Sequence, residues 1–177
     1  QSRVMDRWAE GLLQTLIEIA PRIRENQHDY QLMADFMLSA TMALNGFIAM
    51  GVSQDWATHM IGHEITALHG LTHGHTLAIV LPATLQVLRE AKGDKLVQYG
   101  ERIWGITSGT KEERIDEAIR CTEQFFRSLG LTTRHEENIG QETIFEIERR
   151  FNERGVKYGE NGNVTGAVAR KILETAL

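Results

Sequence analysis

The segment that decides the fold runs from Gln54 to Pro82 and reads QDWATHMIGHEITALHGLTHGHTLAIVLP. Apolar residues recur in it every three or four positions, which is the spacing of a helix with one buried face. We therefore predict one helix over about Gln54 to His69 and a second over about His75 to Glu90, joined by a turn through residues 70–72. Gly70 suits this turn because glycine readily ends a helix in the left-handed conformation.

The apolar run TLAIVL at residues 76–81 admits a second interpretation. A short β-branched run next to a turn could be a buried strand. The helical spacing continues through Leu85 and Leu88, however, so we predict a helix. Because the run is apolar nearly all round, this helix should lie in the middle of the molecule. Pro82 should kink or locally open the helix rather than end it.

The rest of the chain also reads as helices. A first helix carries an apolar face from Val4 to Ile19, and a second spans about Tyr30 to Met50. The second has an apolar stripe that consists of Met33, Met37, Leu44 and Ile48. The methionines of this stripe are expected to be flexible core filler. Four further helices are predicted over about Asp94–Trp104, Lys111–Leu129, Gln141–Arg154 and Thr165–Ala176.

These elements predict an all-α fold, a helical bundle of about seven to eight helices that forms one domain over residues 1–177. Thr110 and Glu113 have the spacing of a capping box, and Gly130 stands where a glycine ends a helix. Residues 155–163 hold three glycines and two asparagines and are predicted to form a loop.

Composition narrows the class of protein. The net charge is −5 with acidic and basic residues interleaved, which indicates no nucleic-acid or anionic-membrane surface. No apolar run was expected to approach the roughly 20 residues that span a bilayer. Cys121 is the only cysteine, so no internal disulfide can form; it should be a small buried helical residue in a cytoplasmic protein. The chain begins at Gln1 inside a charged helical pattern, from which we expect a fragment of a larger protein.

Five of the seven histidines fall between His59 and His75. His59 and His63 are four positions apart, so both should project from one face of a helix. His73 follows the tight turn that can fold the chain back beside that face. Three imidazoles in this arrangement can converge on one divalent ion.

The other four histidines have ordinary explanations. His69 should lie near a helix end, where a positive charge is favourable, and His75 should cap the following helix. His28 and His135 lie in polar surroundings and should be exposed. None of the four is predicted to contact a metal.

Two competing metal motifs fail. The stretch HEITA at residues 63–67 begins like the zinc-protease helix, but Ala67 stands in place of its second histidine. Asp55 could pair with His59 as a ligand, yet a carboxylate in the first turn of a helix is stabilised there in any case. Glycine-rich phosphate loops, a serine nucleophile elbow and a Cys–His pair are absent from the sequence.

The histidine pattern resembles the signature of the iron-containing alcohol dehydrogenases. That signature has a histidine, a second histidine four residues on, a His-Gly pair fourteen after the first, and then Leu-Pro. Here these elements are HMIGH at residues 59–63, THG at 72–74 and VLP at 80–82. The stretches QDWATH at 54–59 and LVQYGERIW at 96–104 are similar to the NADPH-dependent butanol dehydrogenase or aldehyde reductase branch.

The resemblance implies roles for three histidines. His59 and His73 occupy metal-ligand positions for Fe(II) or Zn(II). His63 occupies the position of a histidine beside the metal and the nicotinamide, so it is the candidate catalytic and cofactor-binding residue. The family's other two ligands, an aspartate and a histidine four residues apart, would precede Gln1.

The resemblance also implies an activity. The family has an N-terminal dinucleotide-binding domain, and this chain corresponds to the C-terminal metal-binding helical domain. The intact protein would be a homodimer that interconverts small alcohols and aldehydes by hydride transfer with NADPH or NADH, whereas the isolated chain should bind metal weakly and be inactive. The alternatives are a non-catalytic metal-binding or interaction module, a metal-dependent hydrolase, or another family member of the glycerol or lactaldehyde type.

Overall fold

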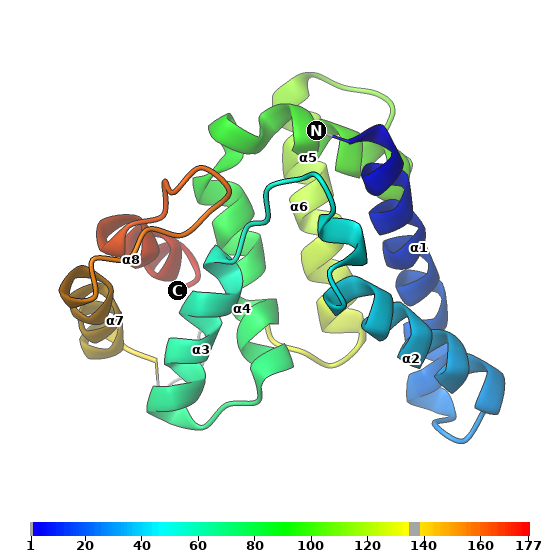
Figure 1. Ribbon diagram of the computed structural model, residues 1–177, viewed down its shortest axis with the longest axis horizontal. Coiled ribbons are helices and arrows are strands. Elements are labelled where there is room, and N and C mark those ends of the chain that lie inside the picture. The colour runs from blue at the N-terminus through cyan, green and yellow to red at the C-terminus, as the bar shows by residue number, and fades with distance from the viewer. Residues whose placement is uncertain (1, 135–138) are drawn as a thin grey trace.

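The computed structural model describes residues 2–134 and 139–177. These residues form eight α-helices and one short 3₁₀ helix, and the described ranges contain no β-strand, so the all-α prediction is confirmed (Figure 1). The elements are α1 (Arg3–Glu25), α2 (Tyr30–Leu44), η1 (Phe47–Ala49), α3 (Ala57–His69), α4 (His73–Val87), α5 (Arg89–Trp104), α6 (Lys111–Ser128), α7 (Gln141–Glu153) and α8 (Gly166–Thr175).

Helix α4 lies in the middle of the molecule, as its apolar sequence predicts. It packs against α3, α5, α6 and α8, while α1 and α2 form a pair at one side (Figure 1). Pro82 is buried within α4 and does not end it. The change of direction comes at Leu88, between α4 and α5, so the predicted break near residues 90–94 is placed a few residues too late.

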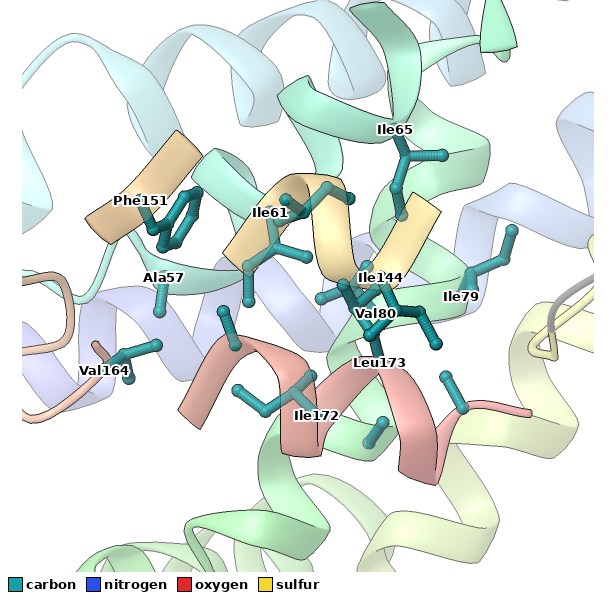
Figure 2. Packing of buried hydrophobic residues seen from close by; sticks show 14 of the residues in the cluster. Ala57, Ile61, Ile65, Ile79, Val80, Ile144, Phe151, Val164, Ile172 and Leu173 are labelled. Atoms are coloured by element: carbon teal, nitrogen blue, oxygen red, sulfur yellow. The ribbon is translucent and has the colours of Figure 1, made fainter. Parts of the chain in front are cut away.

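The main core fills the space between α3, α4, α7 and α8. Figure 2 shows Ile61 and Ile65 of α3 meeting Val80 of α4 and Ile144 and Ile172 of the last two helices; all five are almost completely buried. Burying a side chain of this size stabilises the fold by about 1.5–3 kcal/mol. The helices that carry the histidines are therefore anchored in the larger of the two buried apolar clusters.

The prediction of a single helix from Tyr30 to Met50 is wrong. Helix α2 ends at Leu44, and Gly46 adopts a left-handed φ of 88° before η1 begins. An α-helix cannot continue through that backbone conformation, which glycine adopts without steric cost. Asn45 completes the break, because its side-chain oxygen accepts a hydrogen bond from the Phe47 amide.

The predicted role of the methionine stripe is also wrong for part of α2. Met37 is 60 % exposed and Leu44 is 72 % exposed, so neither fills a core. The segment Tyr30–Ala49 is moreover long and apolar enough to cross a membrane by length and composition alone, contrary to the expectation that no such run exists. Helical spacing identified an apolar face here but not what covers it.

Of the local predictions for α6, those on its two ends are confirmed and the one on Cys121 is wrong. The capping box is confirmed: the Glu113 amide donates to Thr110 Oγ1 at 3.2 Å, and the Thr110 amide donates to Glu113 Oε2 at 2.8 Å. Gly130 follows the end of α6 with a φ of 87°. Cys121 lies in α6 but is only half-buried, which corrects the prediction of a buried residue.

Candidate metal centre

Three histidines from α3 and α4 come together at the crossing of these helices. His59 and His63 project from α3, and His73 is the first residue of α4. The ring centroid of His73 lies 5.2 Å from that of His59 and 4.5 Å from that of His63, while the His59 and His63 centroids are 6.3 Å apart. The three histidine rings, which the sequence places near one another, therefore lie close together in the fold.

The turn between the two helices brings His73 back to α3. Gly70 ends α3 with a φ of 69°, and its amide donates to the Thr66 carbonyl at 2.8 Å. Only Leu71 and Thr72 separate this cap from His73, so α4 must start beside the helix that it follows. Figure 1 shows the two helices joined by this short connection.

Gly62 allows α3 and α4 to approach closely. A Cβ atom at this position would lie 2.9 Å from Thr76 Oγ1 and 3.3 Å from Leu77 Cδ2, so no larger residue fits without movement. Gly62 lies between His59 and His63 in the chain. We did not predict its role, although a glycine inside an otherwise helical pattern signals a close contact.

The three imidazoles differ in environment. His63 is exposed, whereas His59 and His73 are half-buried. Burial lowers the pKa of His59, and the neighbouring His73 and His63 lower it further because like charges repel. Nδ1 of His73 is buried and has no hydrogen-bond partner among the described residues. Neutral imidazoles with an unused ring nitrogen are the form that binds a metal ion.

The described residues do not supply a complete metal site. Within ranges 2–134 and 139–177, no group of three or more His, Cys, Asp or Glu side chains is arranged to hold an ion. The three rings are nevertheless close to one another. The cluster therefore fits part of a coordination sphere that needs further ligands, which normally number at least three from the protein.

The other described histidines lie outside the cluster. His69 interacts through Nε2 with Thr143 Oγ1 at 2.8 Å. His75 lies inside α4 and interacts with Thr132 Oγ1, so it does not cap that helix as predicted. His28 is exposed in the connection between α1 and α2, as predicted, and His135 lies outside the described residues.

Asp55 is not a ligand in this arrangement. It precedes α3 rather than lying in its first turn, and its two oxygens contact the Ala57 amide and the Lys92 ammonium, each at 2.8 Å. Trp56, which we also did not single out, meets the His59 ring edge-on with centroids 5.1 Å apart. The position of Trp56 three residues before His59 in the sequence was the signal that could have predicted this ring contact.

The fold and the site together define a class of protein: an all-α domain in which the crossing of two helices presents a partial histidine cluster. Residues 1–173 match the family described as "Fe-containing alcohol dehydrogenase family, C-terminal", and the chain belongs to this family.

The relatives are oxidoreductases by name. The chain is 48 % identical to the NADPH-dependent aldehyde reductase YqhD of Escherichia coli (strain K12) over 99 % of this chain and 46 % of the relative. It is 33 % identical to the NADH-dependent butanol dehydrogenase A of Clostridium acetobutylicum over 80 % of this chain and 37 % of the relative. The chain thus spans less than half the length of these curated relatives.

Solved structures show the same fold. The substrate- and cofactor-free form of the aldehyde reductase YqhD from E. coli matches with a TM-score of 0.95 and 46 % identity, over 100 % of this chain and 47 % of that one. The NADH-dependent butanol dehydrogenase A from Thermotoga maritima matches with a TM-score of 0.88 and 26 % identity, over 99 % and 46 %. The family resemblance read from the histidine signature is confirmed.

Proposed function

We propose that this chain is the metal-binding helical part of a two-domain enzyme that interconverts small alcohols and aldehydes with NADPH or NADH. The observation that carries the proposal is the meeting of His59 and His73 at the α3–α4 crossing, with Nδ1 of His73 buried and unpaired among the described residues. Membership of the iron-containing alcohol dehydrogenase family supports it.

His59 and His73 would hold Fe(II) or Zn(II), since imidazole sites accept either ion. The ion, when bound, supplies a Lewis acid that stabilises negative charge on the substrate oxygen. Two imidazoles are an incomplete set, so we infer that the remaining ligands come from outside this chain. The lowered pKa of His59 supports this role because it keeps the ring neutral and able to bind near pH 7.

His63 would serve the reaction rather than the metal. It is the most exposed of the three, and its ring centroid lies 4.5 Å from that of His73. A side chain so placed can contact a nicotinamide that enters above the cluster, or relay the alcohol proton. We propose both contact with the cofactor and proton relay for His63.

The nucleotide would be bound mainly by a second domain, because the described helices contain no glycine-rich phosphate loop. NADPH is the preferred cofactor in this proposal, since the relative at 48 % identity is named an NADPH-dependent enzyme. We further propose a cytoplasmic homodimer, in keeping with the single cysteine, Cys121.

The test uses the full-length protein that carries this chain. Metal content is measured by mass spectrometry, and aldehyde reduction is followed by NADPH oxidation. His59→Ala and His73→Ala should each abolish activity and greatly lower the metal content, leaving only weak residual binding by the remaining ligands. His63→Ala should keep the metal, with a lower kcat and an altered pH profile, whereas the exposed His28→Ala should match the wild type.

Two results would contradict the proposal. Full metal content in both His59→Ala and His73→Ala would show that these two histidines do not bind the metal ion. Calorimetry of the 177-residue chain with Zn(II) should give only weak binding, because the ligand set is incomplete. Tight binding by this chain alone would instead favour a non-catalytic metal-binding module.

A further inference from the structure

Three distant segments meet just before α3 through one half-buried lysine side chain. Lys92 of α5 places Nζ 2.8 Å from Asp55 Oδ2 and 3.2 Å from Glu160 Oε1. Asp55 precedes α3, and Glu160 lies in the loop between α7 and α8. We refer to Asp55, Lys92 and Glu160 as the lysine bridge.

Two members of the lysine bridge are partly sheltered from water, whereas the Glu160 side chain is 39 % exposed. The Lys92 side chain is only 15 % exposed and that of Asp55 only 22 %. Burial by itself lowers the pKa of Lys92, but the hydrogen bonds and charges of Asp55 and Glu160 outweigh burial and raise it. Lys92 is therefore charged and contacts two carboxylates. The ion pair of Lys111 with Asp94, by contrast, is exposed.

Asp55 connects this bridge to the start of the histidine helix. Its Oδ1 accepts a hydrogen bond from the Ala57 amide at 2.8 Å, whereas the N-cap residue Trp56 makes no side-chain cap of its own. Ala57 is completely buried, so the first turn of α3 cannot shift freely. His59 lies in that turn, and its ring also meets Trp56.

We propose that Asp55 and Lys92 are positioning residues for His59. Lys92 fixes the orientation of the Asp55 carboxylate, Asp55 fixes the first turn of α3, and that turn together with the Trp56 ring aims the His59 imidazole. This inference rests on the proposed function, in which His59 is a metal ligand. Outer groups that hydrogen-bond a metal ligand directly typically change metal affinity about 10- to 100-fold when they are removed. Lys92 acts through Asp55 and the first turn of α3, so its effect should lie at the lower end of this range.

The experiment compares Lys92→Met and Lys92→Arg in the full-length protein, with Lys111→Met as the matched control for loss of an exposed ion pair. One measurement needs no metal: hydrogen–deuterium exchange of the peptide containing residues 56–60. The other is Co(II) binding, followed by the visible absorption of the bound ion, in the wild-type and His59→Ala backgrounds.

Lys92→Met should speed exchange of the 56–60 peptide, weaken Co(II) binding about 10-fold and change the Co(II) spectrum. Lys92→Arg should keep the exchange rate, the Co(II) affinity and the Co(II) spectrum near their wild-type values, because arginine preserves the positive charge beside the carboxylates. In the His59→Ala background Lys92→Met should cause no further loss of affinity, since the residue that it positions is gone. Lys111→Met should behave as the wild type.

The contrary outcomes separate the two proposals. If Lys92→Met speeds exchange but leaves the Co(II) affinity and spectrum unchanged, the bridge only ties helices together and the inference is wrong. The same holds if Lys92→Met weakens binding equally in the His59→Ala background. If the wild type binds no Co(II), the proposed function itself fails, and this inference fails with it. Should Lys92→Met not fold, Asp55→Asn replaces it, with the same expected result.

Discussion

At the scale of single residues, the histidine geometry depends on a position without a side chain. Gly62 lies between His59 and His63 of α3 and faces Thr76 of α4. The distance between the two helices at this point sets how far His73 is from His59 and His63. A side chain on residue 62 would act on all three imidazoles by moving the helices apart.

Gly62→Ala should destabilise the fold by about 1–3 kcal/mol, the usual cost of an added methyl group in a packed interior. The new Cβ would lie 2.9 Å from Thr76 Oγ1, closer than normal packing allows. Gly11→Ala in α1 is the matched control: nothing lies within 4 Å of its Cβ, so it should stabilise by about 0.5–1 kcal/mol. Urea denaturation measures both. Equal stabilisation by the two substitutions would show that the α3–α4 contact is not tight.

At the scale of secondary-structure elements, α2 has, like its neighbour α1, few buried residues for its length. It packs mainly on α1 and η1, and only Leu32 and Ser39 are buried in it. Most of its apolar side chains lie on the surface, Tyr30 and Leu38 among them. Its sequence is as apolar as that of α4, yet α4 is enclosed by four helices and α2 is not.

Two equal substitutions within α2 should therefore have unequal effects. Leu32 is 5 % exposed and Leu44 is 72 % exposed. Leu32→Ala should lower the free energy of unfolding by about 2–4 kcal/mol, because it removes buried apolar surface and leaves a cavity. Leu44→Ala should change it by less than about 0.5 kcal/mol. Chemical denaturation of the chain measures both free energies of unfolding. An equal loss of stability in the two variants would mean that Leu44 is covered in solution.

At the scale of the whole molecule, stability should respond to pH in two separate ranges. Hydrogen bonds from Arg149 and then Arg150 lower the pKa of Glu146 to about 2, so its contribution is lost only as the pH falls below about 4.5. His59 acts at higher pH. Its pKa is lowered below the ordinary value of 6.5 by burial and by the charges of His73 and His63. The unfolded chain thus binds more protons at His59 than the folded chain does.

The metal-free chain should accordingly lose stability as the pH falls below about 6.5, and His59→Gln should reduce that loss. Above this range His59 is neutral in both the folded and the unfolded chain, so its titration contributes no pH dependence there. Urea denaturation between pH 7.5 and 5 provides the measurement, with His28→Gln as a control that keeps the histidine cluster intact. If the free energy of unfolding of His59→Gln depends on pH as strongly as that of the wild type, groups other than His59 cause the loss of stability.

Much of this architecture could be predicted from the sequence. Helical spacing identified the helices, the capping box at Thr110 marked the start of α6, and the short turn at Gly70 placed His73 beside His59 and His63. These features are local: each depends on residues a few positions apart, whose spacing decides which backbone hydrogen bonds form and which face is apolar. The family signature added the chemistry of the histidines.

The contacts between distant segments could not be predicted in this way. Asp55 could be read as a ligand or as an ordinary residue of the first helical turn, and only the fold brings Lys92 and Glu160 to it. Likewise, the apolar stripe of α2 indicates a face to be covered but not whether Met37 and Leu44 are covered in this chain.

The sequence by itself therefore determined the helical class, the positions of most helices and the identity of the histidine cluster. The tertiary structure decided how closely α3 and α4 approach at Gly62 and which residue pairs with the Asp55 carboxylate. It also decided which apolar faces stay exposed. The physical reason is that periodicity and capping act within a few residues of the chain, whereas packing and ion pairing depend on which segments the whole fold brings together.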